Sequence, residues 1–217
     1  ERHSDRNRQT VTERAARNLD AGNEQPVGVV AENRDAVPEV GERIDYKGSV
    51  LIHLEAEEIA RSVRSLIGRG AESIAIALLW SLTNDAHERA LADFIKKNYP
   101  SIYLSLSSEV APFLGEYERT ATTVFNAYVG PKIAAYLRGL GELLRSKGLG
   151  REPLVMQAYG GVLGINDTCK NAVGTIESGP ASGIIGSRFI GAELGVADVL
   201  ATDMGGTTFK VGVIRDG

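Results

Sequence analysis

The last stretch of the chain constrains the fold most, because two apolar runs flank a short glycine-rich turn. The first run ends at Thr202, the second extends from Phe209 to Ile214, and Asp203-Met204-Gly205-Gly206-Thr207-Thr208 lies between them. This pattern predicts two strands joined by a tight turn. Adjacent glycines bring backbone N–H groups against an anion, while an acid and hydroxyls can hold a metal ion and phosphate oxygens. The turn is therefore either a nucleotide-phosphate loop or an ordinary Gly-Gly hairpin with a solvated aspartate.

A second glycine-containing turn precedes these strands. Glu177-Ser178-Gly179-Pro180 stands before an apolar pattern, and a proline just inside a helix start is the expected N-terminal signal. The free N–H groups of the first turn, with the positive end of the helix dipole, can bind an anion. The alternative is a simple cap on a helix that packs closely through Gly183 and Gly186.

The middle of the chain alternates between helical and strand periods. A helix is predicted from Glu55, a buried strand over Ile74 to Trp80, and a second strand over residues 102–106. Asp85 and Glu88 have the spacing of a capping box for the helix between the two strands. Helix, strand, helix and strand with short links predict βαβ units and a mainly parallel sheet, so the fold class is α/β.

A long helical pattern follows from Glu116 to Lys147, in which Pro131 is expected to break or kink the helix. Beyond the proline, an apolar seam at coiled-coil-like spacing predicts an intramolecular core, with a subunit contact as the alternative. The residues of this seam are Ile133, Tyr136, Leu137, Leu140, Leu143 and Leu144.

A further strand over residues 154–157 ends in a Gly160-Gly161 turn. Open α/β sheets place ligands at strand ends. We therefore expect Gln157, Tyr159, Gly160 and Gly161 to line a substrate pocket.

Composition excludes several classes of function. The 217 residues are 43% hydrophobic and 24% charged, which is enough for a real core in one large or two small domains. A formal net charge of −4 with scattered basic residues argues against a nucleic-acid partner. No apolar run approaches the ~20 residues of a membrane span. A single cysteine, Cys169, forms no internal disulfide and fits a cytoplasmic protein.

The first 37 residues are polar and charged, and they predict a loosely attached segment. Ala15, Ala16 and Leu19 could form one face of a short helix, and Val27 to Val30 a short strand. His53 and His87 have no second ligand at metal-binding spacing, so we interpret both as structural.

Taken together, several motifs resemble the hydantoinase/oxoprolinase family, over about residues 38 to 217 and in the family's order. The motifs are Ser105-Leu-Ser-Ser-Glu-Val110, Glu116-Tyr-Glu-Arg-Thr-Ala-Thr-Thr-Val124 with Asn126-Ala-Tyr128, Met156-Gln157 with Gly160-Gly161, Ser178-Gly-Pro180 and Asp203-Met-Gly-Gly-Thr207. The family contains ATP-dependent hydantoinases, 5-oxoprolinases and related subunits of acetone and acetophenone carboxylases. Members are similar to the actin, Hsp70 and sugar-kinase superfamily, in which two ribonuclease-H-like lobes close over ATP.

The resemblance implies that this chain is an excised piece of a longer protein, because an earlier Asp-x-Gly-Gly-Thr loop that opens the first lobe has no copy here. The expected parts are a polar segment over residues 1–37, a βαβ part of the N-terminal lobe ending in the long helix over 38–150, and the start of the catalytic domain over 151–217.

The implied activity uses ATP and Mg²⁺ to phosphorylate a carbonyl or amide oxygen of the substrate. In the hydantoinase and oxoprolinase branch a cyclic amide is then hydrolysed; in the carboxylase branch a ketone is carboxylated. Members work with a second subunit of the hydantoinase B type, so such a partner is expected. The alternative from another class is a non-catalytic scaffold or subunit-binding module.

The resemblance assigns roles to particular residues. Asp203 would face the phosphates and hold the metal. Gly205, Gly206, Thr207, Thr208, Ser178 and Gly179 would bind phosphate. Glu116 and Arg119 would line the substrate pocket, although a salt bridge along the helix is an alternative for Arg119.

Two positions depart from the family's pattern. Lys210 stands where a second acid usually follows the loop, and it either contacts a phosphate oxygen as a catalytic residue or marks a loop that has lost activity. Ala158 replaces a small polar residue after Met156-Gln157, which puts one substrate contact in doubt.

Overall fold

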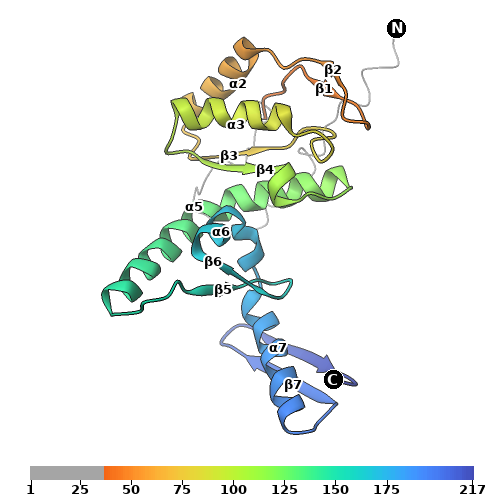
Figure 1. The fold of residues 1–217 in the computed structure, drawn as a ribbon, viewed down its shortest axis with the longest axis vertical. Helices are drawn as coiled ribbons and strands as arrows, with labels where there is room; N and C mark the ends of the chain where they lie inside the picture. The colour runs from red at the N-terminus through yellow and green to blue at the C-terminus, as the bar shows by residue number, and fades with distance from the viewer. Residues whose placement is uncertain (1–36) are drawn as a thin grey trace. The chain divides into compact units, whose positions relative to one another are not determined.

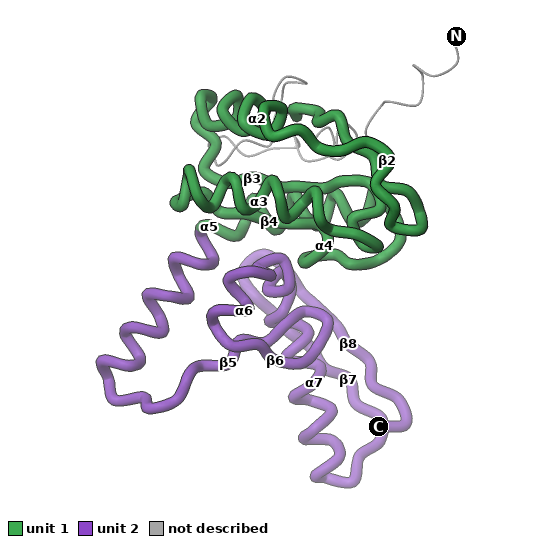
Figure 2. The backbone as a smooth tube through the Cα atoms, turned by 45° about the horizontal axis from the view of Figure 1, so that its top comes forward, with its two compact units in different colours: residues 1–131 green, residues 132–217 purple. Residues whose placement is uncertain are grey.

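The computed structural model describes residues 37–217, which fall into two compact units, Glu1–Pro131 and Lys132–Gly217 (Figure 2). The short helix around Ala15 and the strand at Val27 to Val30 lie outside the described residues. The division between the units falls inside a long helix, and the domain boundary at residue 150 stays a prediction.

Unit 1 opens with a small antiparallel hairpin, β1 (Arg43–Ile44) and β2 (Val50–Ile52). Asp45 closes its turn, because its Oδ1 accepts hydrogen bonds from the backbone N–H groups of Lys47 at 2.9 Å and Ser49 at 2.8 Å. Short acidic side chains commonly stabilise turns in this way.

The predicted βαβ unit is confirmed. Strand β3 (Ser73–Ile76) pairs in parallel with β4 (Tyr103–Leu106), and α3 (Ala86–Asn98) connects them (Figure 1). Helix α2 (Ala56–Gly68) precedes β3. A parallel pair requires a crossover, and the helical period between the two strands supplies it.

The core of unit 1 lies between these helices and strands. Its buried apolar side chains come from the faces that the sequence periods predict, and each Val, Leu or Ile among them contributes about 1.5–3 kcal/mol by leaving water. They are Ile59, Val63, Ala71, Ile74, Ile76, Leu91, Ala92, Ile95 and Leu106.

Strand β3 is shorter than its apolar run, since it ends at Ile76 and not at Trp80. Trp80 has a left-handed backbone, with φ 61°. The backbone N–H and carbonyl of Leu78 are held by side chains rather than by a neighbouring strand. Tertiary hydrogen bonds therefore end the strand where hydrophobicity alone predicts that it continues.

After the short helix α4 (Ser107–Val110), helix α5 (Glu116–Ser146) runs through Pro131 without ending. Of the predicted break or kink, the break is wrong, because a proline removes only one of the many hydrogen bonds of so long a helix; the kink stays a prediction. Beyond the proline the buried face consists mainly of small residues, Ala134 and Gly141, with Leu137. Tyr136 and Leu143 of the predicted seam are 66% and 55% exposed, so they lie outside this face.

Unit 2 contains two antiparallel hairpins and the helices beside them. Strands β5 (Leu154–Met156) and β6 (Val162–Gly164) lead into α6 (Ile165–Lys170) and the 3₁₀ turn η2 (Ala172–Thr175). Helix α7 (Ser178–Glu193) precedes strands β7 (Val199–Met204) and β8 (Phe209–Ile214). The predicted elements β5, α7, β7 and β8 are confirmed, whereas β6, α6 and η2 have no counterpart in the sequence predictions.

Both units are of mixed α/β class, but the predicted mainly parallel sheet is wrong: among the described residues β3–β4 is parallel and the other three strand pairs are antiparallel. Among the described residues, no helix is both long enough and apolar enough to cross a lipid bilayer.

Candidate functional site

The predicted phosphate loop forms the end of the β7–β8 hairpin. The strands pair from Val199↔Ile214 to Met204↔Phe209, and the N–H of Gly205 donates to the Thr208 carbonyl at 2.9 Å. Asp203 and all residues from Gly205 to Thr208 are exposed. The turn thus presents its backbone and hydroxyl groups to solvent.

The fold itself does not require glycine at positions 205 and 206. Neither residue has a left-handed φ. A Cβ at Gly205 would meet only the Thr208 carbonyl oxygen, at 3.8 Å, and a Cβ at Gly206 would meet nothing within 4 Å. The turn conformation therefore does not explain why both positions are glycine. Without side chains, both positions let a ligand approach the backbone closely.

The second predicted anion site is the start of α7. Glu177 occupies the N-cap position in a left-handed conformation, with φ 61° and ψ 18°, and no side chain caps the helix. Gly179 is exposed, and a Cβ there would meet nothing within 4 Å. The first-turn N–H groups are therefore without a side-chain cap and face a site free of side-chain bulk.

An ion pair joins the two predicted anion sites. The Nζ of Lys210 in β8 lies 2.7 Å from Oε2 of Glu177, next to Ser178. Asp203 stands directly opposite Lys210 in the strand register. The structure therefore brings Asp203, Lys210 and the Ser178 turn together within unit 2.

A metal at this turn would have one carboxylate ligand from the chain. Residues 37–217 contain no group of three or more His, Cys, Asp or Glu side chains placed to hold a metal ion. Mg²⁺ typically binds through one or two carboxylates, with phosphates and water completing its shell. Asp203 thus fits a magnesium ion that arrives with a nucleotide, and does not fit a metal centre built from protein ligands alone.

The predicted pocket residues of β5 and its turn divide into buried and exposed members. Gln157 is fully buried, and its Nε2 donates to the Val155 carbonyl at 3.0 Å and to Thr168 Oγ1 at 3.4 Å. Tyr159 is 68% exposed. Gly160 and Gly161 have left-handed φ values of 90° and 77°, which the turn requires.

The hydroxyl of Tyr159 accepts a hydrogen bond from Asn171 Nδ2 at 3.2 Å. The Oδ1 of the same Asn171 is buried and lacks a hydrogen-bond partner within the described residues. Gln157 therefore stabilises the turn from inside, and Tyr159 is its exposed side chain.

Glu116 and Arg119 lie in the first turn of α5 in unit 1, and one is exposed while the other is buried. Glu116 is exposed. Arg119 is buried, and its guanidinium donates to the Ser81 hydroxyl at 2.7 Å and to the Leu78 carbonyl at 2.6 Å. Neither of these partners is an acid on the same helix, and the guanidinium is engaged within unit 1.

Glu88 is a buried acid whose role the sequence analysis missed. Instead of closing a capping box, its carboxylate accepts hydrogen bonds from the Leu78 N–H, the Ser107 hydroxyl, and both the N–H and hydroxyl of Ser108, at 2.6–3.0 Å. Ser107 and Ser81 hydroxyls lie 3.1 Å apart and connect this carboxylate to Arg119. The signal in the sequence for this carboxylate site is the Ser107-Ser108 pair after β4, because both residues donate hydrogen bonds to Glu88.

His87 and Cys169 agree with structural roles, whereas His53 is exposed and its structural role stays a prediction. His87 Nδ1 lies 2.6 Å from Glu42 Oε2, and both side chains are buried. Burial raises the pKa of the Cys169 thiol, with Arg138 opposing this in part. A raised pKa disfavours the reactive thiolate.

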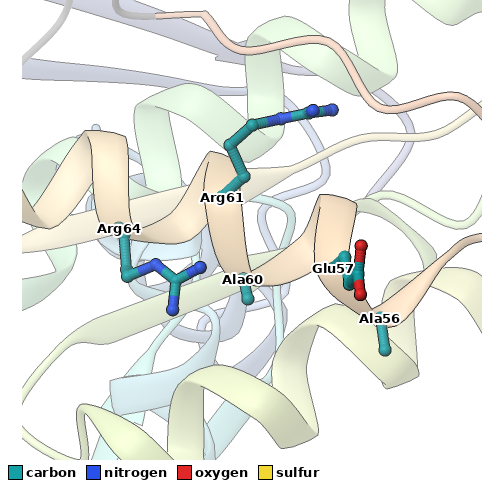
Figure 3. A pocket seen from close by; sticks show the side chains of 5 residues that line it. All are labelled: Ala56, Glu57, Ala60, Arg61 and Arg64. Carbon is teal, nitrogen blue, oxygen red and sulfur yellow. The ribbon is translucent and has the colours of Figure 1, made fainter.

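A shallow depression of about 610 Å³ lies on the outer face of α2, away from these groups (Figure 3). Its lining consists of Ala56, Glu57, Ala60, Arg61 and Arg64. The two arginines are exposed and no motif residue reaches it, so we assign it no role.

Comparison with known proteins identifies the relatives of this chain. Residues 119–217 match the family model described as hydantoinase/oxoprolinase, and residues 10–99 match the model of the hydantoinase/oxoprolinase N-terminal region. The acetophenone carboxylase gamma subunit of Aromatoleum aromaticum is 35% identical over 95% of this chain and 28% of its own length.

Two solved structures are similar as well. Nucleotide-free acetone carboxylase superposes with a TM-score of 0.72 at 30% identity, over 82% of this chain and 25% of that one. The ATP-dependent caprolactamase from Pseudomonas jessenii superposes with a TM-score of 0.74 at 27% identity, over 93% of this chain and 30% of that one. The chain thus spans between a quarter and a third of the length of these relatives. With both family models matched in the family's order, the chain belongs to the hydantoinase/oxoprolinase family.

Proposed function

We propose that this chain supplies part of the nucleotide-phosphate site of an ATP-dependent hydantoinase/oxoprolinase-family enzyme. The observation that carries the proposal is the pair Gly205-Gly206, exposed and without a conformational or packing need for glycine. Close approach of a phosphate to the backbone explains both glycines.

The residues around this turn divide the work. Gly206 donates its backbone N–H, and Gly205, whose own N–H bonds the Thr208 carbonyl, leaves room for the phosphate to approach. Thr207 and Thr208 donate hydroxyl hydrogen bonds to phosphate oxygens. Ser178 and Gly179 bind phosphate from the start of α7. Asp203 holds Mg²⁺ and orients the attacking group, while Lys210 offsets negative charge. Such preorganised donors stabilise the charge that develops during phosphoryl transfer.

The proposed reaction activates a poor electrophile. ATP transfers its γ-phosphoryl group to the carbonyl or amide oxygen of a cyclic amide and leaves as ADP. Water then adds to the activated carbon, the C–N bond breaks as the ring nitrogen departs with a proton, and a second water releases inorganic phosphate from the resulting acyl phosphate. The actin-like lobe implied by the family resemblance would enclose this step. Tyr159 is the exposed side chain of the predicted pocket within unit 2 and is proposed to contact the substrate, while the substrate role of Glu116, exposed in unit 1, stays a prediction.

Carboxylation of a ketone is the second candidate. It is favoured by the acetophenone carboxylase gamma subunit, which matches 95% of this chain at 35% identity, whereas caprolactamase subunit alpha matches 82% at 29%. Both relatives are named as subunits, which supports a partner subunit, for which we propose the hydantoinase B type.

The proposal is tested by measuring MgATP binding to the full-length protein by calorimetry. Gly206→Ala and Asp203→Asn are each expected to raise the Kd at least about tenfold, because the added methyl group keeps phosphate from the backbone and the neutral amide binds the metal more weakly than a carboxylate. The thermal unfolding midpoint of Gly206→Ala should stay unchanged, since its added methyl group meets no atom of the fold.

Gly139→Ala is the matched control, because this helical glycine also faces open space but lies outside the proposed site. Its MgATP affinity should equal that of the wild type. Absence of MgATP binding by the wild type, or equal affinity of all variants, contradicts the proposal and favours a scaffold.

A further inference from the structure

Lys210 points to the face of the β7–β8 hairpin that packs on α7. A Cβ built at Gly212 would overlap Ile184 of α7, so side chains at position 212 face that helix. Lys210 lies two residues earlier in the same strand and therefore faces the same side. Asp203 is directly opposite in the register, so its side chain shares this face.

Glu177 holds the Lys210 ammonium from the α7 side. Its Oε2 lies 2.7 Å from Nζ, although the Glu177 side chain is 67% exposed and the Lys210 side chain 36% exposed. Such exposed pairs are easily exchanged, because water and salt screen them. The pair links β8 to the residue that precedes the uncapped first turn of α7.

The backbone of Glu177 is unusual for its residue type. Its φ of 61° lies in the left-handed region, which disfavours glutamate. Strained residues of this kind cluster at ligand sites and switch regions. Here the strained residue is Glu177, and its carboxylate binds the Lys210 ammonium beside the proposed phosphate turn.

We propose that the Glu177 carboxylate stands in for phosphate: it binds Lys210 while the site is empty, and an arriving phosphate oxygen takes Lys210 from it. This inference rests on the proposed function and adds a competition internal to the chain. The Lys210 ammonium is a compact point charge, and a phosphate group carries more negative charge than one carboxylate, so phosphate attracts the ammonium more strongly. Release of Glu177 also frees the start of α7 from β8.

The competition has a measurable sign. Removal of the Glu177 charge eliminates the competitor, so Glu177→Gln should bind inorganic pyrophosphate more tightly, with a Kd about two- to fivefold lower. Lys210→Met removes the shared cation and should raise that Kd about tenfold. Glu193→Gln is the matched control, because it makes the same charge change at the far, exposed end of α7.

The experiment is a calorimetric titration of the full-length protein with inorganic pyrophosphate, alongside amide hydrogen exchange of residues 178–182. Without pyrophosphate, exchange in this segment should be faster in both Glu177→Gln and Lys210→Met than in the wild type. A double variant, Glu177→Lys with Lys210→Glu, should restore slow exchange but not pyrophosphate affinity. Slow exchange without pyrophosphate affinity in the double variant distinguishes the two roles of Lys210, namely forming an ion pair with residue 177 and binding the pyrophosphate anion.

Two results would overturn the inference. One is a Glu177→Gln variant that binds pyrophosphate no better than Glu193→Gln, and the other is an exchange pattern that neither single variant alters. Failure of the proposed function is distinct, because it appears as loss of MgATP binding by the wild type whatever the response to pyrophosphate.

Discussion

The Nη1 of Arg119 lies 2.7 Å from the Ser81 hydroxyl oxygen and donates a hydrogen bond to it inside unit 1. The second terminal nitrogen donates to the Leu78 carbonyl at 2.6 Å. The residue is only 3% exposed. One guanidinium thus fastens the loop after β3 to the first turn of α5.

Arg119→Lys should lower the free energy of unfolding of unit 1 by about 2 kcal/mol, because one ammonium cannot reproduce the fork that bonds both acceptors. Urea unfolding of the 217-residue chain can be followed through Trp80, its single tryptophan. Arg64→Lys, on the exposed face of α2, should change the midpoint little. Equal midpoints for both variants would refute the structural role of Arg119.

Glu88→Gln should destabilise unit 1 by about 2–3 kcal/mol, because an amide cannot accept from all of the donors that surround this carboxylate. The same tryptophan signal reports the change. Glu57→Gln, which neutralises an exposed acid on α2, serves as the control. A Glu88→Gln midpoint equal to that of Glu57→Gln would show that the network contributes nothing.

Gly130→Ala and Gly139→Ala should change stability in opposite directions although both lie in α5. A Cβ at Gly130 would overlap the Tyr103 ring, whereas one at Gly139 would meet nothing within 4 Å. Overpacking should cost about 1–3 kcal/mol at position 130. Higher helix propensity should add up to about 1 kcal/mol at position 139. Thermal unfolding of the two variants side by side tests the sign of each effect.

The Cys169 thiol should react slowly with a disulfide reagent in the folded chain. Burial raises its pKa, so less thiolate is present at a given pH than in unfolded protein. The folded state therefore favours the neutral thiol, and the resulting stability is complete below the unfolded pKa and is lost as pH rises towards the folded pKa. Fast labelling at pH 8 without denaturant would contradict this.

The hydrogen bond from Arg89 holds the pKa of the Asp85 carboxyl below its ordinary value. Because the folded pKa is lowered, the resulting stability is present above the unfolded pKa and is lost as pH falls through the folded pKa. Both side chains are partly exposed, so a double-mutant cycle of Asp85→Asn and Arg89→Gln should give a small stabilising coupling at neutral pH. The coupling should decrease as pH falls through the folded pKa of Asp85, and Glu57→Gln on α2 should show none with Arg89→Gln.

The order and type of most elements could be read from the sequence. The helical periods at Ile59 and Leu91 predict α2 and α3, and the links between the strands predict the parallel β3–β4 pair. The Gly-Gly and Ser-Gly-Pro signals likewise place the β7–β8 turn and the start of α7. These features follow from local patterns, which bury one face or form a turn within a short stretch of chain.

Tertiary structure alone decided where the polar side chains go. Glu88 has the spacing of a capping residue, yet its partners lie 10 to 20 positions away. Lys210 pairs with Glu177, 33 residues earlier, and not with the aspartate across the strand. Such pairings depend on which buried or adjacent groups remain unsatisfied once the elements pack, and no short-range pattern contains that information.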